Sequence, residues 1–164
     1  MKVNFFDLRC QTITEVALFG LCDNEDKTPS YISLNKPEKW NATVRNQTCR
    51  KITHTAIDNC IVITRENGQM DNRCDCMLTY QNNIVFIELK NKGSDWIGDG
   101  INQIEATIQN FRKNHELTGI KHKRAFVANR KHPNFHVIDN ETSRKFWDKH
   151  RVRLNIDSEI YIYS

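Results

Sequence analysis

The chain has 164 residues, 38% of them hydrophobic and 27% charged, which is the balance of a single globular domain with one core. No apolar run approaches the roughly 20 residues that span a bilayer, so we expect no membrane-spanning helix. Residues 1–19 are interrupted by Asp7, Arg9 and Glu15, which argues against an export signal and favours a cytoplasmic location. The net charge of +4 is a mild excess that alone excludes little.

The six cysteines are the next feature that bounds the protein class. Because no export signal is expected, we predict reduced, mostly buried thiols in place of a disulfide scaffold. The Asn-x-Ser/Thr sequons at Asn41, Asn46 and Asn140 then carry no meaning, since a cytosolic chain never meets the glycosylation machinery.

Predicted elements follow the chain from its first third. Residues 5–21 favour a first helix, and the polar residues 23–37, with Pro29 and Pro37, predict a loop or insertion. Residues 55–64 are rich in Ile and Val and predict a strand. Asn67-Gly68 is a strong hairpin signal, because both residues accept positive φ, and it leads into a second predicted strand at residues 73–80.

The remaining elements are indicated by apolar periodicity. After a tight turn in residues 81–83, residues 84–90 form a nearly continuous apolar strand, as expected where both faces are covered. Helical spacing predicts a helix over residues 97–111, followed by a strand at 124–129 and a helix at 140–150 capped by Asp139 or Asn140. Residues 152–156 and 160–163 predict a closing hairpin. This order predicts one α/β domain, residues 1–164, with a mixed central β-sheet (an antiparallel meander, then helix and strand) flanked by helices.

Basic residues gather in residues 112–153, where acids are few. The ordinary interpretation is a solvated surface, and the functional one is a side of the molecule that faces phosphates. The residues concerned are Arg112, Lys113, Lys121, Lys123, Arg124, Arg130, Lys131, Arg144, Lys145, Lys149, Arg151 and Arg153.

Strand register can be worked out from the first predicted turn. If Asn67-Gly68 are its two central residues, Cys60 lies opposite Asp75 and Asp58 lies opposite Met77. Side chains alternate along a strand and facing residues share a face, so Asp58 and Asp75 are expected on the same side of the sheet.

The second predicted turn brings three charged residues together. With Asn82-Asn83 as central residues, Asp75 faces Lys90, and Glu88 lies on the same face. Moving the turn to Gln81-Asn82 keeps Asp75, Glu88 and Lys90 together, whereas a three-residue loop or a bulge would separate them. The plain alternative is that Glu88 and Lys90 end a solvated strand and Asp75 is a turn residue.

Charged groups that converge on an apolar sheet are costly to bury without partners, and a dication removes the repulsion between carboxylates. Oxygen ligands suit Mg²⁺ or Mn²⁺, with waters completing the shell. Such a cation polarises a phosphoryl oxygen and lowers the pKa of a bound water, and Lys90 beside it would balance developing negative charge.

Asp75, twelve intervening residues and then Glu88-Leu89-Lys90 resemble the PD-(D/E)xK nuclease superfamily, the restriction-endonuclease-like enzymes. The resemblance covers about residues 55–129. It implies that Asp75 and Glu88 are metal ligands, that Lys90 is the catalytic lysine, and that Gln103 on the following helix reaches the site. The proline of the motif is absent here, since Cys74 precedes Asp75.

Many members of that superfamily also carry a glutamate on a first helix, for which Glu15 is the candidate, with Asp58 as a replacement acid. The resemblance implies a Mg²⁺-dependent nuclease acting on DNA, in a defence or repair setting. The alternative is an inactive nuclease-like module that binds nucleic acid or a protein. Because the chain is short, specificity would come from residues 23–37, a homodimer or a partner protein.

Two other residue sets offer weaker candidates for a site. Cys74-x-Cys76 with Cys60 and Cys49 lacks the paired spacing of a zinc site, so buried thiols are expected. Trp96 is expected either to stack on a base or to anchor the core.

Overall fold

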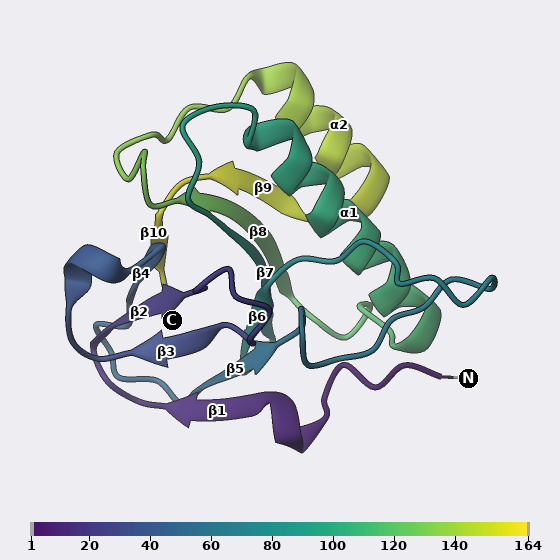
Figure 1. Cartoon of the computed structure of the whole chain (residues 1–164), viewed down its shortest axis with the longest axis horizontal. Helices are drawn as coiled ribbons and strands as arrows, with labels where there is room; N and C mark the ends of the chain where they lie inside the picture. Colours follow the sequence, from purple (N-terminus) through teal and green to yellow (C-terminus); the bar gives the residue numbers. More distant parts are fainter. Residues whose placement is uncertain (1, 164) are drawn as a thin grey trace.

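The computed structural model describes residues 2–163 and shows an α/β fold with two mixed β-sheets and two α-helices (Figure 1). The larger sheet has the strand order β1-β5-β6-β7-β8-β9, in which β7, β8 and β9 are parallel and the other neighbours antiparallel. Its strands are β1 (Gln11–Thr14), β5 (Ile52–Ala56), β6 (Cys76–Tyr80), β7 (Asn83–Lys90), β8 (His122–Asn129) and β9 (Arg153–Ile156).

A second, smaller sheet has the order β10-β4-β2-β3, and it was not predicted. Its strands are β2 (Leu18–Cys22), β3 (Tyr31–Ser33), β4 (Ala42–Arg45) and β10 (Glu159–Tyr161). The helices are α1 (Ile97–Asn114) and α2 (Asn140–His150), and in the described part of the chain neither is apolar enough to cross a membrane. The predicted α/β class and its mixed sheet are confirmed, but both helices lie on one face of that sheet and the smaller sheet covers the other.

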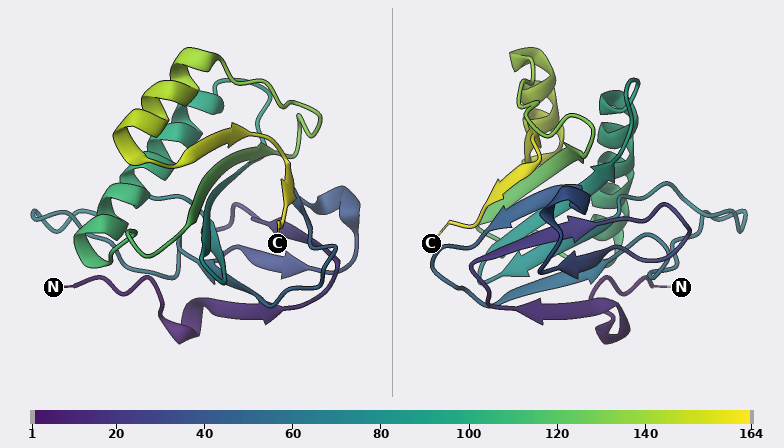
Figure 2. Two further views of the ribbon diagram at one scale, coloured as in Figure 1. Left: turned by 180° about the vertical axis from the view of Figure 1, so that it is seen from behind. Right: turned by 60° about the vertical axis from the view of Figure 1, so that its left-hand side comes forward.

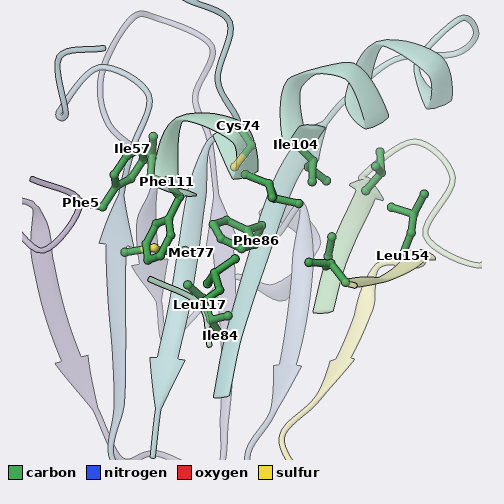
Figure 3. Close-up of a cluster of buried hydrophobic side chains, with 14 of the residues drawn as sticks. Phe5, Ile57, Cys74, Met77, Ile84, Phe86, Ile104, Phe111, Leu117 and Leu154 are labelled. Atoms are coloured by element: carbon green, nitrogen blue, oxygen red, sulfur yellow. The ribbon is translucent and has the colours of Figure 1, made fainter. Parts of the chain in front are cut away.

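β7 lies between two cores, because the helices cover one face of the larger sheet and the smaller sheet packs against the other (Figure 2). Ile84 and Phe86 point to the helix side, where Phe86 meets Phe111 of α1 (Figure 3). Val85 and Ile87 belong to the core beneath the smaller sheet. This double burial explains why residues 84–90 are nearly continuous in apolar residues.

Two of the three predicted helices, those at residues 97–111 and 140–150, are confirmed, and a glycine sets how closely α1 approaches the sheet. At Gly100, an added Cβ would lie 2.6 Å from Cγ1 of Val127 in β8. The helix therefore packs its first turns directly on β7 and β8. α2 begins after Asp139, whose side chain accepts a hydrogen bond from the backbone N–H of Thr142, as a helix cap does.

The predicted first helix at residues 5–21 is wrong. The segment forms a short 3₁₀ turn, Leu8–Cys10, followed by β1 and β2. Thr12, Ile13 and Thr14 are β-branched and pair with β5, which favours extended backbone over helix. The predicted loop at residues 23–37 also contains β3, an edge strand of the smaller sheet.

The predicted strand at residues 55–64 ends early. Its apolar residues Ile57, Ile61 and Ile63 turn into the helix-side core, and the backbone N–H of Ile61 donates to the carbonyl of Ile57. The chain reverses here through a three-residue loop, Glu66-Asn67-Gly68, and not through a two-residue turn: the backbone N–H of Arg65 donates to the carbonyl of Gln69, and only Gly68 has a positive φ, +84°. The loop closes one isolated bridge, between Thr64 and Met70. The register expected from it is therefore wrong, since Met77 faces Thr55 and not Asp58.

Two further expectations are corrected by long-range contacts. Cys10 and Cys60 form a disulfide, so the cysteines are not all reduced, although Cys22, Cys74 and Cys76 are free and buried as predicted. The closing hairpin does not form, because β9 pairs with β8 in the larger sheet and β10 pairs with β4 in the smaller one. The last two strands thereby join the two sheets.

Candidate functional site

The turn between β6 and β7 places two carboxylates opposite each other. Tyr80 pairs with Asn83, so Gln81-Asn82 are the central residues, and Gln81 has the positive φ of +46° that this tight turn requires. Cys76 pairs with Ile87, and one step further along, Asp75 faces Glu88. Of the two registers considered for this turn, this is the one that sets Asp75 against Glu88.

Each carboxylate accepts a backbone hydrogen bond from the opposite strand. The backbone N–H of Asp75 donates to Oε1 of Glu88 over 3.1 Å, and the backbone N–H of Leu89 donates to Oδ2 of Asp75 over 2.7 Å. These bonds extend the contact between the two strands to Asp75, the residue just before β6 begins. They fix both carboxyl groups on the helix side of the sheet.

Lys90 and Gln103 complete a chain of polar contacts from β7 to α1. Nζ of Lys90 lies 3.0 Å from Oε2 of Glu88 and donates to Oε1 of Gln103 over 2.5 Å. The Gln103 amide also donates to the carbonyl of Arg73 over 3.4 Å. The structure therefore brings together the four residues that the resemblance singled out, from two strands and one helix.

Burial governs the electrostatics of this cluster, because Asp75, Glu88 and Lys90 are only 6%, 3% and 7% exposed. Burial, then the negative charge of Glu88, raises the pKa of Asp75 well above its usual value. Burial also raises the pKa of Glu88, against the opposing effects of its contacts with Asp75 and Lys90. Two such carboxyls favour a shared proton or a cation between them.

A third acid, Asp23, lies beside this pair and was missed. It follows β2 of the smaller sheet, and its charge contributes to the raised pKa of Asp75. Burial raises the pKa of Asp23 itself, although the contact with Asp75 opposes that rise. No local signal in the sequence could have found Asp23, because only the packing of the two sheets brings it here.

Asn41 connects the segment that carries Asp23 with the end of β7, and it is 3% exposed. Its Oδ1 accepts from the backbone N–H of Asp23 over 3.0 Å, and its Nδ2 donates to the carbonyl of Lys90 over 3.0 Å. Asn41 therefore holds the end of β2 against the end of β7. It is a positioning residue.

The two proposed extra acids have different positions. Asp58 lies near the pair, since its charge contributes to the raised pKa of Glu88. Its Oδ1 lies 2.8 Å from Nε of Arg73, so Asp58 already has a cationic partner. Glu15 is exposed between β1 and β2, on no helix, and shares none of the hydrogen bonds or ion pairs described for residues 2–163 with the cluster. Glu15 is therefore replaced as the third acid by Asp23.

The other candidates belong to the core. Trp96 is 6% exposed and stacks on His132 with ring centroids 6.0 Å apart, so it anchors the loop before α1 and offers no face to a base. Burial raises the pKa values of the Cys74 and Cys76 thiols, which opposes the thiolate that zinc requires. Between residues 2 and 163, no three His, Cys, Asp or Glu side chains are arranged to hold a metal ion.

Comparisons with protein-family models, with curated proteins and with solved structures found no significant match to this chain.

The carboxylate oxygens of Asp75 and Glu88 are of the donor type that hard dications bind. Asp75 and Glu88 supply facing oxygens, and Glu88 is paired with Lys90, whereas Asp75 has no ion pair among the described residues. Asp23 lies near Asp75, but the three carboxylates are not arranged around a common point. Mg²⁺ and Mn²⁺ need only one or two protein carboxylates, because waters and substrate oxygens fill the remaining positions.

Proposed function

We propose that this chain is a Mg²⁺- or Mn²⁺-dependent nuclease that hydrolyses phosphodiester bonds in DNA. One observation carries the proposal: Asp75 and Glu88 face each other across β6 and β7, with Lys90 paired to Glu88 and Gln103 on Lys90. Two buried acids with raised pKa values beside a lysine are an arrangement that functional sites use and that a stable core avoids.

The strand order supports the finer fold assignment in this proposal, a restriction-endonuclease-like core. β5, β6 and β7 form an antiparallel meander, α1 crosses over, and β8 returns parallel to β7. This is the order of elements that the resemblance implies, with its acid before β6 and its Glu-x-Lys at the end of β7. The chain departs from it at the amino end, where β1 and β2 stand in place of a first helix.

Each residue of the cluster has a distinct task in this proposal. Asp75 and Glu88 would hold the dication, which lowers the pKa of a bound water and polarises the scissile phosphate. Lys90 would place its ammonium near the attacked phosphate and offset the negative charge that develops there. Gln103 holds Nζ of Lys90 from the helix side, so the lysine is oriented before substrate arrives.

Because the cluster is buried, a metal ion could bind only by competing with a group that already contacts the carboxylates. The ion pair between Lys90 and Glu88 is the contact that a dication competes with, because both cations seek the oxygens of Glu88. Asp75 and Glu88 would hold the metal, and Gln103 would then remain as the hydrogen-bond partner of Lys90. A single lysine faces two buried carboxyls here, so the negative charge of the pair is only partly offset.

A cleavage assay on several substrates tests the proposal. Single-stranded, duplex and branched DNA and RNA would be incubated with wild type and with Glu88→Gln, in Mg²⁺, in Mn²⁺ and in EDTA. We expect wild type to cleave at least one DNA substrate only with a dication. Glu88→Gln should be slower by at least about two orders of magnitude, the loss typical of one essential group at a catalytic site.

Glu38→Gln is the matched control, since Glu38 is exposed in the 3₁₀ turn Pro37–Lys39 and touches no member of the cluster. It should cleave at the wild-type rate. Equal activity of Glu88→Gln and wild type would show that the site is elsewhere. If wild type cleaves no substrate in any metal, the nuclease proposal fails and a binding module becomes the better account.

A further inference from the structure

A basic cleft of about 540 Å³ lies at the amino ends of β8 and β9, away from the acid pair. Five of its lining residues carry fixed positive charge: Lys121, Lys123, Arg124, Arg151 and Arg153. No Asp or Glu lines it. Lys121, Arg151 and Arg153 are exposed, and Lys123 and Arg124 are half-buried. Like charges gathered in this way repel one another, so the cleft favours a polyanionic ligand.

Two aromatic side chains line the same cleft and are open to solvent. Trp147 of α2 is 42% exposed and Tyr163 is 62% exposed, so neither ring is needed to fill the core. Large exposed aromatic rings among lysines and arginines are the combination with which proteins hold single-stranded nucleic acid, because bases stack on rings and cations pair with phosphates. A site for duplex backbone alone would need only the cations.

Arg124 and Arg151 are positioned by these aromatic rings. The guanidinium of Arg124 lies 5.2 Å from the ring centroid of Tyr163, and it donates to the hydroxyl of Tyr80 over 3.0 Å. The guanidinium of Arg151 lies 5.8 Å from the ring centroid of Trp147. Cations fixed in this way lose little conformational freedom when a phosphate binds.

The cleft is separated from the acid pair by the full length of β7 and β8. These strands pair from Asn83 and His122, at the cleft, to Lys90 and Asn129, at the acid end. Seven residue steps of about 3.3 Å place the two ends about 23 Å apart. That span matches about seven nucleotides of stacked strand at about 3.4 Å each.

We propose that this cleft is a second nucleic-acid site, which binds one single strand through its phosphates and through a base stacked on Trp147. The binding itself is independent of the acid pair. That the bound strand is a flank of the cleaved DNA rests on the proposed function. The protein then holds its substrate at two places, and only a strand longer than about seven nucleotides reaches both.

Binding in EDTA tests the cleft without cleavage. A fluorescent 16-nucleotide DNA strand would be titrated with wild type, with Lys121→Glu/Arg153→Glu and with Trp147→Ala, at several salt concentrations. The double variant should bind at least about tenfold more weakly. Its slope of log affinity against log salt should flatten by about 1.4, since each lost phosphate contact on a single strand contributes about 0.7.

Trp147→Ala should weaken binding by about tenfold, the effect of one lost stacking contact, and leave the salt slope unchanged. A duplex of equal length should be insensitive to Trp147→Ala. The matched control is Lys36→Glu/Lys39→Glu, which changes net charge equally at two exposed lysines outside the cleft. The control should bind within about twofold of wild type, and unchanged melting temperatures would show that all variants are folded.

The proposal is overturned if the control loses as much affinity as the cleft variant, or if no oligonucleotide binds wild type. Stronger binding of duplex, with equal loss from Trp147→Ala, would also overturn it. If wild type cleaves DNA, the cleft variant should raise KM for a 16-nucleotide substrate and leave that for a 4-nucleotide substrate unchanged. If wild type cleaves nothing, the proposed function fails while the binding result still decides the cleft.

Discussion

β7 and β8 run side by side over eight residue pairs and end in two opposite kinds of charged surface. At the carboxyl end of β7, acids and a lysine are buried and bonded to one another. At the amino end of β8, exposed and half-buried cations lie beside exposed aromatic rings, with no acid lining the cleft. Burial therefore separates two uses of charge in the proposed functions: the buried acids would bind a dication, and the cations of the cleft would hold a long polyanion.

The largest effect is expected from removing the one buried cation at the acid end. Lys90→Ala should lower cleavage by about two to three orders of magnitude, because the transition state loses its electrostatic partner. Lys90→Met, which keeps more of the side-chain volume, should lose as much. The measurement is single-turnover cleavage of the best substrate in Mg²⁺.

Lys92→Ala is the control for this test, because Lys92 is exposed only two residues further along. It should retain nearly full activity. If Lys92→Ala is as slow as Lys90→Ala, general positive charge at this end matters and the specific role of Lys90 is wrong.

The next largest effect is expected on stability: added metal should stabilise variants of the basic end but not variants of the acid pair. A dication at one hundred times its Kd should stabilise wild type by about 2.7 kcal/mol. Asp75→Ala and Glu88→Ala should lose this gain, whereas Lys121→Glu/Arg153→Glu at the basic end should keep it. Thermal unfolding with and without Mn²⁺ measures the shift, and an equal shift in all four proteins would place the metal elsewhere.

The free energy of unfolding should also depend on pH through His54, which contacts Ser30 close to Asp75. Burial lowers the pKa of His54 to about 4, and its Nε2 lies 3.1 Å from the hydroxyl of Ser30. The unfolded chain binds the proton more tightly, so the contribution of His54 to stability is present above pH 6.5 and is lost as pH falls toward 4. The loss is about 1.4 kcal/mol per pH unit within this window.

Chemical denaturation of wild type and His54→Leu between pH 7 and pH 4.5 measures this dependence. The stability of wild type relative to His54→Leu should fall as the pH falls. His122→Gln, at an exposed histidine that lines the basic cleft, is the control. Parallel pH profiles for wild type and His54→Leu would show that His54 accepts its proton without cost in the folded state.

The smallest effect is expected from neutralising the basic end. Lys121→Gln/Arg153→Gln should change the free energy of unfolding by no more than about 0.5 kcal/mol, as exposed substitutions do. Urea denaturation measures it. A loss well above about 1 kcal/mol would mean that these cations stabilise the fold, which would remove the reason to assign them to a ligand.

The parts of this protein that sequence predicts well are those with a local cause. The helical spacing from Ile97 to Phe111 and the apolar run of β7 depend only on nearby residues, and both elements form as expected. The grouping of Asp75, Glu88 and Lys90 also needed only one tight turn. The choice between two adjacent registers could not be made in advance, because Gln81 takes a positive φ that sequence statistics assign more readily to asparagine.

The parts that failed depend on contacts between distant segments. The smaller sheet assembles strands from both ends of the chain, so neither its existence nor the arrival of Asp23 has a local signature. Residues 57–63 looked like a strand because their isoleucines are apolar, but they reach the core through a turn. The disulfide between Cys10 and Cys60 spans 50 residues and depends on the pairing of β1 with β5.

The burial of Asn41 has a practical consequence for making the protein. An oligosaccharide is attached to the side-chain nitrogen of a sequon asparagine, and in Asn41 that nitrogen donates to the carbonyl of Lys90. In Asn46 it donates to the carbonyls of Val16 and Arg50 in a fully buried position. A glycosylated amide keeps only one N–H, so Asn46 would lose at least one of its two bonds, and neither buried position has space for a sugar. A eukaryotic secretory expression host would therefore trap the chain unfolded, and a host that adds no such sugars is the suitable choice for every experiment above.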